Sequence, residues 1–178
     1  LAARLARTTG AKPRLIPGGK EICRRIGVVT GGAGNELKLA AAAGVDTFDC
    51  ADIYGIGASE LVVGQVLKEL LSRDEYVLTT KVSMPMGRAA NQGGLSRKHI
   101  IEGVDRSLKR LGHDYIDQLI IHRHPHGIPG QAQTPIEETM EALNDVVKAG
   151  KALYLGAQGA NGGPHYLTTQ PSYFGIND

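Results

Sequence analysis

The stretch Gly-Val-Asp-Thr-Phe-Asp-Cys-Ala-Asp-Ile-Tyr-Gly, residues 44–55, contains a short run that ends at Asp49 and a glycine-bounded segment that carries Tyr54. Further runs rich in apolar and β-branched residues follow at 77–81, 116–121 and 153–155. Amphipathic segments separate these runs. This alternation is typical of repeated βα units around a parallel sheet, so the sequence predicts an α/β fold.

The segments between the predicted strands carry helical periodicity and helix-end signals. One helix is predicted after Ser59 as N-cap, with an apolar face made of Leu61, Val62, Val66, Leu67 and Leu70. A second is predicted from Ser96 to Gly112. A third opens with a capping box at 134–137, ends near Gly150 and has Met140, Leu143 and Val147 on its core face.

No linker divides the chain, which predicts one domain over 26–178 after a poorly structured segment at 1–25. The glycine-containing segments 8–35 and 156–165 are predicted loops.

The composition excludes several classes of protein. The 178 residues carry 20 Lys and Arg against 18 Asp and Glu, which excludes a strongly basic nucleic-acid surface. No apolar stretch approaches the ~20 residues that span a bilayer, so no membrane partner is expected. Cys23 and Cys50 support neither a disulfide scaffold nor a cysteine zinc site, which favours a reducing compartment, the cytoplasm. The arginine-rich, acid-free residues 1–20 leave an organelle transit peptide open.

Ionisable residues stand at the ends of successive predicted strands, where a parallel βα array places its working groups. Asp49, Lys81 and His122 end three strands, and Tyr54 lies in the loop after the first. A phenol with a pKa near ~10 needs a neighbouring cation to act as an acid at neutral pH. Lys81 could supply that charge, Asp49 could hold the lysine, and His122 could hydrogen-bond a substrate carbonyl. Each residue alone also has a purely structural explanation, but together they suit carbonyl reduction.

Six segments, in this order, resemble the aldo-keto reductase superfamily, in particular its aryl-alcohol-dehydrogenase-like and potassium-channel β-subunit branches. They are residues 44–55 with Ser59-Glu60 and Gly64, then 95–103, 107–117, 121–124, 134–139 and 147–156.

The resemblance implies a (β/α)8 TIM barrel that reduces a small aldehyde or ketone with NADPH, without metal or flavin. It assigns Tyr54 as the general acid, Lys81 as the group that lowers the tyrosine pKa, and His122 as the group that orients the carbonyl. Asp49 completes this set and lies at the cofactor. Gln158 stands where the family normally has Asn, and Gln170 matches a glutamine that contacts the nicotinamide carboxamide.

The length departs from the family pattern. A barrel of this kind takes about 250 residues, and only residues 159–169 separate Gln158 from Gln170, too few for a helix and two loops. We expect an incomplete barrel of about six strands, the first at 26–29, without the last two strands and one helix. Such a remnant would expose apolar edges, which leaves open instability, a homo-oligomer formed through the exposed barrel edge, or an incomplete gene product.

Two competing motifs are weaker. The glycine run at 28–34 lacks the third spaced glycine of a dinucleotide fingerprint. His122, His124 and His126 alternate as zinc ligands would, but Pro125 interrupts the strand, so no metal is expected. The functional hypotheses are therefore an NADPH-dependent carbonyl reductase and, as the alternative, a non-catalytic barrel subunit or an inactive fragment without firm cofactor binding.

Overall fold

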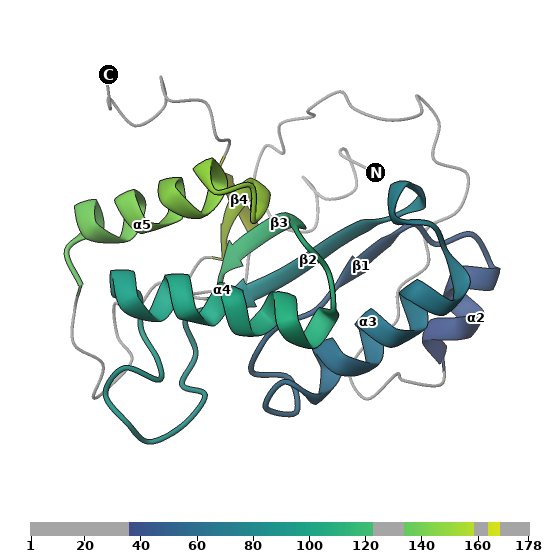
Figure 1. The fold of residues 1–178 in the computed structure, drawn as a ribbon, viewed down its shortest axis with the longest axis horizontal. Helices are drawn as coiled ribbons and strands as arrows, with labels where there is room; N and C mark the ends of the chain where they lie inside the picture. The colour runs from purple at the N-terminus through teal and green to yellow at the C-terminus, as the bar shows by residue number, and fades with distance from the viewer. Residues whose placement is uncertain (1–35, 123–133, 159–163, 168–178) are drawn as a thin grey trace, which may run out of the picture.

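The computed structural model describes residues 36–122, 134–158 and 164–167, which form one sheet covered by helices (Figure 1). The sheet has the strand order β1-β2-β3-β4-β5. Strands β1 to β4 are parallel to their neighbours, and β5 is antiparallel to β4. The strands are β1 (Thr47–Asp49), β2 (Val77–Val82), β3 (Ile116–Ile121), β4 (Ala152–Gln158) and β5 (Pro164–Leu167).

Helices connect the parallel strands, as the alternation in the sequence predicted. They are α3 (Ala58–Leu70), α4 (Arg97–Leu111) and α5 (Ile136–Lys148), with a 3-10 turn, η1 (Arg73–Glu75), before β2. A further helix, α2 (Glu36–Ala42), precedes β1. Each α-helix packs against the next, and α3 and α4 lie side by side along the sheet (Figure 1). This is a partial α/β fold with the strand and helix order of a βα barrel.

The core lies between the sheet and these helices. Successive strand residues point to opposite faces, so every second residue of β2 and β3 meets the helices. Burial of each large side chain contributes roughly 1.5–3 kcal/mol. The core residues that are at most 1% exposed include Leu67, Leu78, Ile100, Val104, Leu111, Ile116, Leu119 and Leu143.

The prediction for the start of α3 was wrong. The N-cap is Gly57, with φ 88°, and Ser59 lies inside the helix, where its hydroxyl is 3.1 Å from the Cys50 thiol. The predicted apolar face was only partly correct. Leu61, Val62 and Leu70 are exposed, whereas Glu60, Val63, Gly64, Val66 and Leu67 are buried.

The predictions for the ends of the two later helices had different outcomes. Helix α4 begins as predicted, because the Ser96 hydroxyl accepts a hydrogen bond from the His99 amide, and it ends at Gly112 with φ 66°. The capping box predicted for α5 is wrong, because Pro135 is the N-cap and no side chain caps the helix. On its core side Leu143 is buried, and Met140 and Val147 are partly buried against the core.

The segment at 156–165 is not simply a loop, because β4 continues to Gln158 and β5 begins at Pro164. A parallel return would need a crossover of about a dozen residues. Only residues 159–163 are available, which accounts for the antiparallel pairing of β5. The predictions for 1–35, including the strand at 26–29 and the glycine run, and those for His124, His126 and Gln170 fall outside the described residues.

Candidate functional site

The parallel sheet brings the predicted site residues to one edge. Asp49 is the last residue of β1, Lys81 lies one residue before the end of β2, and His122 directly follows β3. The register pairs Phe48 with Leu78 and Val82 with Ile121, so the carboxyl ends of the three strands lie next to one another. The sequence prediction that these side chains share one end of the sheet is therefore correct.

The Lys81 ammonium is almost fully buried and doubly held. Its Nζ donates to Asp49 Oδ2 in an ion pair and to the Cys50 carbonyl oxygen at 2.7 Å. The Lys81 side chain is 7% exposed, whereas the Asp49 side chain is 55% exposed. A buried charge requires partners of this kind, so the lysine has a fixed place at the site.

Tyr54 lies between this cation and His122. Lys81 Nζ is 5.2 Å from the centroid of the Tyr54 ring. The Tyr54 and His122 rings meet edge to face, with centroids 5.7 Å apart and an interplanar angle of 87°. His122 is buried, and its backbone amide donates to the Val82 carbonyl at 2.8 Å. Tyr54 is 43% exposed, so a small molecule can reach the phenol while the cation and the imidazole stay behind it.

Gln158 ends β4 at the same edge. Its neighbour Ala157 pairs with Ile121, the residue before His122, which places Gln158 beside the site. Gln158 Oε1 is buried without a hydrogen-bond partner in the part of the chain that the structure describes. A buried acceptor of this kind fits the amide of a nicotinamide carboxamide.

A buried polar layer at the loop that carries Tyr54, residues 50–57, was not predicted. Glu60 is fully buried, and its carboxylate accepts from Thr80 and Arg110. Asp52 is 1% exposed, and burial, reinforced by the Glu60 charge, raises the pKa of its carboxyl to about 7. A signal for Glu60 was present in the sequence, because Glu60, Val63, Gly64 and Leu67 share one helical face. An acidic residue on a core stripe indicates a buried polar contact.

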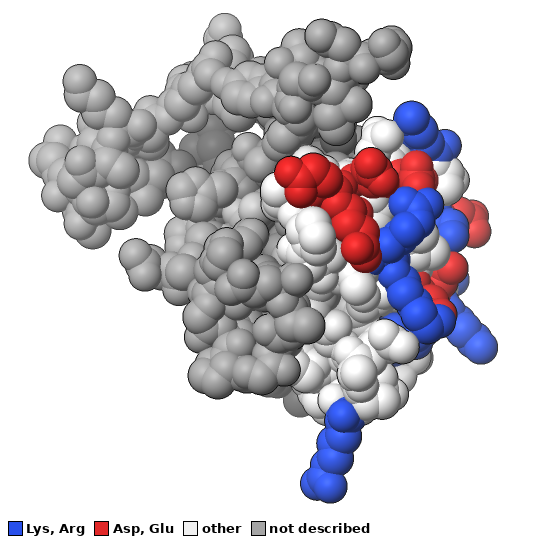
Figure 2. Space-filling model, turned by 90° about the vertical axis from the view of Figure 1, so that its left-hand side faces the viewer, with Lys and Arg blue, Asp and Glu red and all other residues white. Residues whose placement is uncertain are grey.

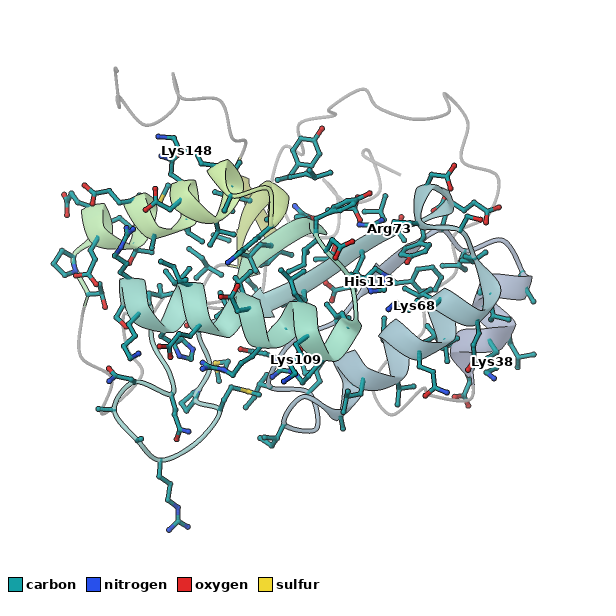
Figure 3. The ribbon with its side chains drawn as sticks, viewed as in Figure 1. Lys38, Lys68, Arg73, Lys109, His113 and Lys148 are labelled. Carbon is teal, nitrogen blue, oxygen red and sulfur yellow. The ribbon has the colours of Figure 1, made fainter. Side chains whose placement is uncertain are left out.

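Other polar groups lie away from this edge. At the amino ends of the strands, Arg73 donates to Asp117 Oδ2 at 2.5 Å and stacks over the Tyr115 ring at 3.9 Å. Figure 3 shows Arg73 close to His113, where α4 leads into β3. Figure 2 shows acidic and basic side chains interspersed on the face that forms the left-hand side of Figure 1, consistent with surface ion pairs such as Arg97–Asp145.

Within the described ranges, no three His, Cys, Asp or Glu side chains are grouped as metal ligands would be. No helix in those ranges has the length and apolar character needed to cross a membrane.

Comparison with known proteins places this geometry in a family. The family model described as "Aldo/keto reductase family" matches residues 33–161. Among curated relatives, "Putative voltage-gated potassium channel subunit beta" of Schizosaccharomyces pombe is 47% identical over 124 residues, covering 68% of this chain and 34% of the relative. "Versiconal hemiacetal acetate reductase" of Aspergillus parasiticus is 42% identical over 132 residues, covering 64% of this chain and 36% of that protein.

A solved structure agrees with these matches. The holo form of aldo-keto reductase AKR11C1 from Bacillus halodurans superposes with a TM-score of 0.58 and 30% sequence identity, covering 72% of this chain and 41% of that one. The chain spans about a third of the length of the curated relatives it matches. With the strand order, the site at the carboxyl edge and the family match in agreement, the chain belongs to the aldo/keto reductase family.

Proposed function

We propose that this chain carries the catalytic centre of an NADPH-dependent oxidoreductase that reduces an aldehyde or ketone to an alcohol. The observation that carries the proposal is Tyr54, a solvent-accessible phenol placed between the buried Lys81 ammonium and the His122 ring. Membership of the aldo/keto reductase family supports a nicotinamide cofactor and a small carbonyl substrate.

Each residue of the site has its own role in the proposed reaction. When bound, a nicotinamide cofactor would supply a hydride to the carbonyl carbon. The Tyr54 hydroxyl gives its proton to the carbonyl oxygen, so that carbon and oxygen each gain a hydrogen and the alcohol forms. The Lys81 ammonium stabilises the phenolate left on Tyr54, because an opposite charge within a few ångströms favours the ionised form.

The other residues position these groups. Asp49 holds the Lys81 ammonium through their ion pair. His122 donates a hydrogen bond to the carbonyl oxygen, which keeps that oxygen at the tyrosine. Gln158, whose side-chain oxygen is buried and unpartnered among the described residues, would hold the nicotinamide carboxamide by accepting a hydrogen bond from its amide.

The test is a fluorescence titration of the 178-residue chain with NADPH, in parallel with NADH, followed by NADPH consumption with a panel of small aldehydes and ketones. The proposal requires a dissociation constant for NADPH below about 1 mM, equivalent to roughly 4 kcal/mol of binding, together with carbonyl-dependent turnover. Folded protein that binds no NADPH, as judged by circular dichroism and titration, would refute it.

A non-catalytic binding subunit is the second candidate. It is favoured by the 47% identity to a relative whose name describes a potassium channel subunit. That function predicts NADPH binding without turnover of any carbonyl in the panel, so the same two assays separate the candidates.

A further inference from the structure

We propose that Glu60 and Arg110 are positioning residues that hold the tyrosine loop, residues 50–57, in the conformation that presents Tyr54 to Lys81. Neither is one of the proton-transfer residues of the proposed function, which are Asp49, Tyr54, Lys81 and His122. This inference rests on the proposed function for its kinetic consequence, but its structural consequence is measurable without catalysis.

The tyrosine loop has a strained end that needs external support. Gly55, Ile56 and Gly57 have φ values of 61°, 53° and 88°, so three consecutive residues are left-handed. This conformation is uncommon for any residue other than glycine and is a true outlier for a β-branched one such as Ile56. Backbone of this kind persists only where the surrounding structure determines it.

Glu60 fixes the first turn of α3, directly after the strained residues. The side chain is fully buried, and both of its oxygens are used. Oε1 accepts from Thr80 Oγ1 at 2.6 Å, and Oε2 accepts from Arg110 Nε at 2.6 Å. Charge-assisted hydrogen bonds of this length in a buried environment leave the carboxylate one position.

Arg110 also supports the loop by direct packing. A Cβ atom at Gly57 would lie 2.6 Å from Arg110 Cδ and 2.8 Å from Nε, so the arginine stem lies against the Gly57 backbone. Its Nη2 donates to Ser107 Oγ at 3.1 Å, which holds the guanidinium on α4. The end of the tyrosine loop is therefore enclosed between α4 and the start of α3.

The same carboxylate connects the loop to the strand of the site lysine. Thr80, which donates to Glu60, immediately precedes Lys81 in β2. Because neighbouring strand residues point to opposite faces, Thr80 meets the helices while Lys81 meets Tyr54 on the other face. Glu60 thus joins the loop that carries the phenol to the strand that carries its cation.

The test compares Thr80→Val, which removes the hydroxyl, with Thr80→Ser, which retains it, and Arg110→Lys with Lys109→Gln. Lys109 lies on the same helix and is exposed (Figure 3). We expect Thr80→Val and Arg110→Lys to lower kcat for carbonyl reduction by about 10- to 100-fold, as small misplacements of reacting groups do, with the dissociation constant of NADPH changed less than about twofold. Thr80→Ser and Lys109→Gln should retain kcat.

Hydrogen exchange gives the second measurement. The Tyr54, Ile56, Ala58 and Ser59 amides are all hydrogen-bonded within or next to the loop. In Thr80→Val and Arg110→Lys their exchange should accelerate by about 10-fold or more, while β3 amides stay protected.

The positioning role is refuted if loop exchange is unchanged in both variants, or if Thr80→Ser loses as much kcat as Thr80→Val. If the unmodified chain shows no carbonyl turnover, the proposed function fails by itself, and the exchange rates still decide whether Glu60 and Arg110 hold the loop.

Discussion

Asp52 offers the sharpest prediction about stability. Its carboxyl is 1% exposed, Oδ1 has no hydrogen-bond partner within the described residues, and burial followed by the Glu60 charge raises its pKa from 3.8 to about 7. The Ile53 amide and the charges of Arg110 and Arg106 oppose this rise without cancelling it. At 1.36 kcal/mol per pKa unit, the ionised carboxylate costs the folded protein about 4 kcal/mol.

The direction of the pH dependence follows from the raised pKa. Between about pH 4 and 7 the folded chain holds a proton at Asp52 that the unfolded chain has released. The stabilising contribution of the protonated carboxyl is therefore complete below about pH 4 and is lost as the pH rises through about 7.

Asp52→Asn keeps the shape of the side chain and removes its titratable carboxyl. Urea unfolding followed by circular dichroism should show the variant gaining about 2 to 3 kcal/mol relative to the wild type between pH 5 and pH 8. Asp46→Asn is the control, because it makes the same chemical change at an exposed position. A difference between variant and wild type that does not vary with pH, or that varies in the opposite direction, would refute the account of a protonated, buried Asp52.

Three further changes test the packing. Neutral His113 accepts a hydrogen bond from the Tyr76 hydroxyl, and burial lowers the pKa of His113 below 6.5. The contribution of His113 to the free energy of unfolding should therefore be lost as the pH falls below about 6.5. In urea unfolding, His113→Gln should reduce this loss of stability at acidic pH. Gly64→Ala would place Cβ 2.1 Å from the Leu111 carbonyl oxygen and should cost about 3 kcal/mol or more, and a cost below about 1 kcal/mol would show that α3 and α4 separate easily. Ile56→Asn should raise the free energy of unfolding by roughly 0.5–1 kcal/mol, because asparagine tolerates a left-handed conformation, whereas a loss of stability would contradict strain at this position.

The sheet and its site edge were predictable from sequence because they depend on short-range patterns. Asp49, Lys81 and His122 each close a short β-forming run, and parallel pairing then places them side by side without further information. Tyr54 follows the first run within a few residues. The grouping of these four residues is therefore visible in local order along the chain.

The features that were missed depend on contacts between distant segments or on an altered turn. Arg110 reaches Glu60 across fifty residues of sequence, and its place on α4 does not by itself distinguish a solvated side chain from a partner of a buried acid. The left-handed turn at Gly57 sets the start of α3, and the packing of α3 against the rest of the fold leaves Leu61 and Val62 exposed. The antiparallel β5 arose because the chain after Gln158 is too short to cross back in parallel.

The proposed role of Tyr54 as proton donor in carbonyl reduction is tested most directly by the rate of carbonyl-dependent NADPH consumption by Tyr54→Phe. Removal of a general acid costs about 10²- to 10⁴-fold in rate. The kcat of Tyr54→Phe should fall by a factor in that range, with the dissociation constant of NADPH changed less than about twofold. A Tyr54→Phe variant that keeps the kcat of the wild type would show that Tyr54 is not the proton donor.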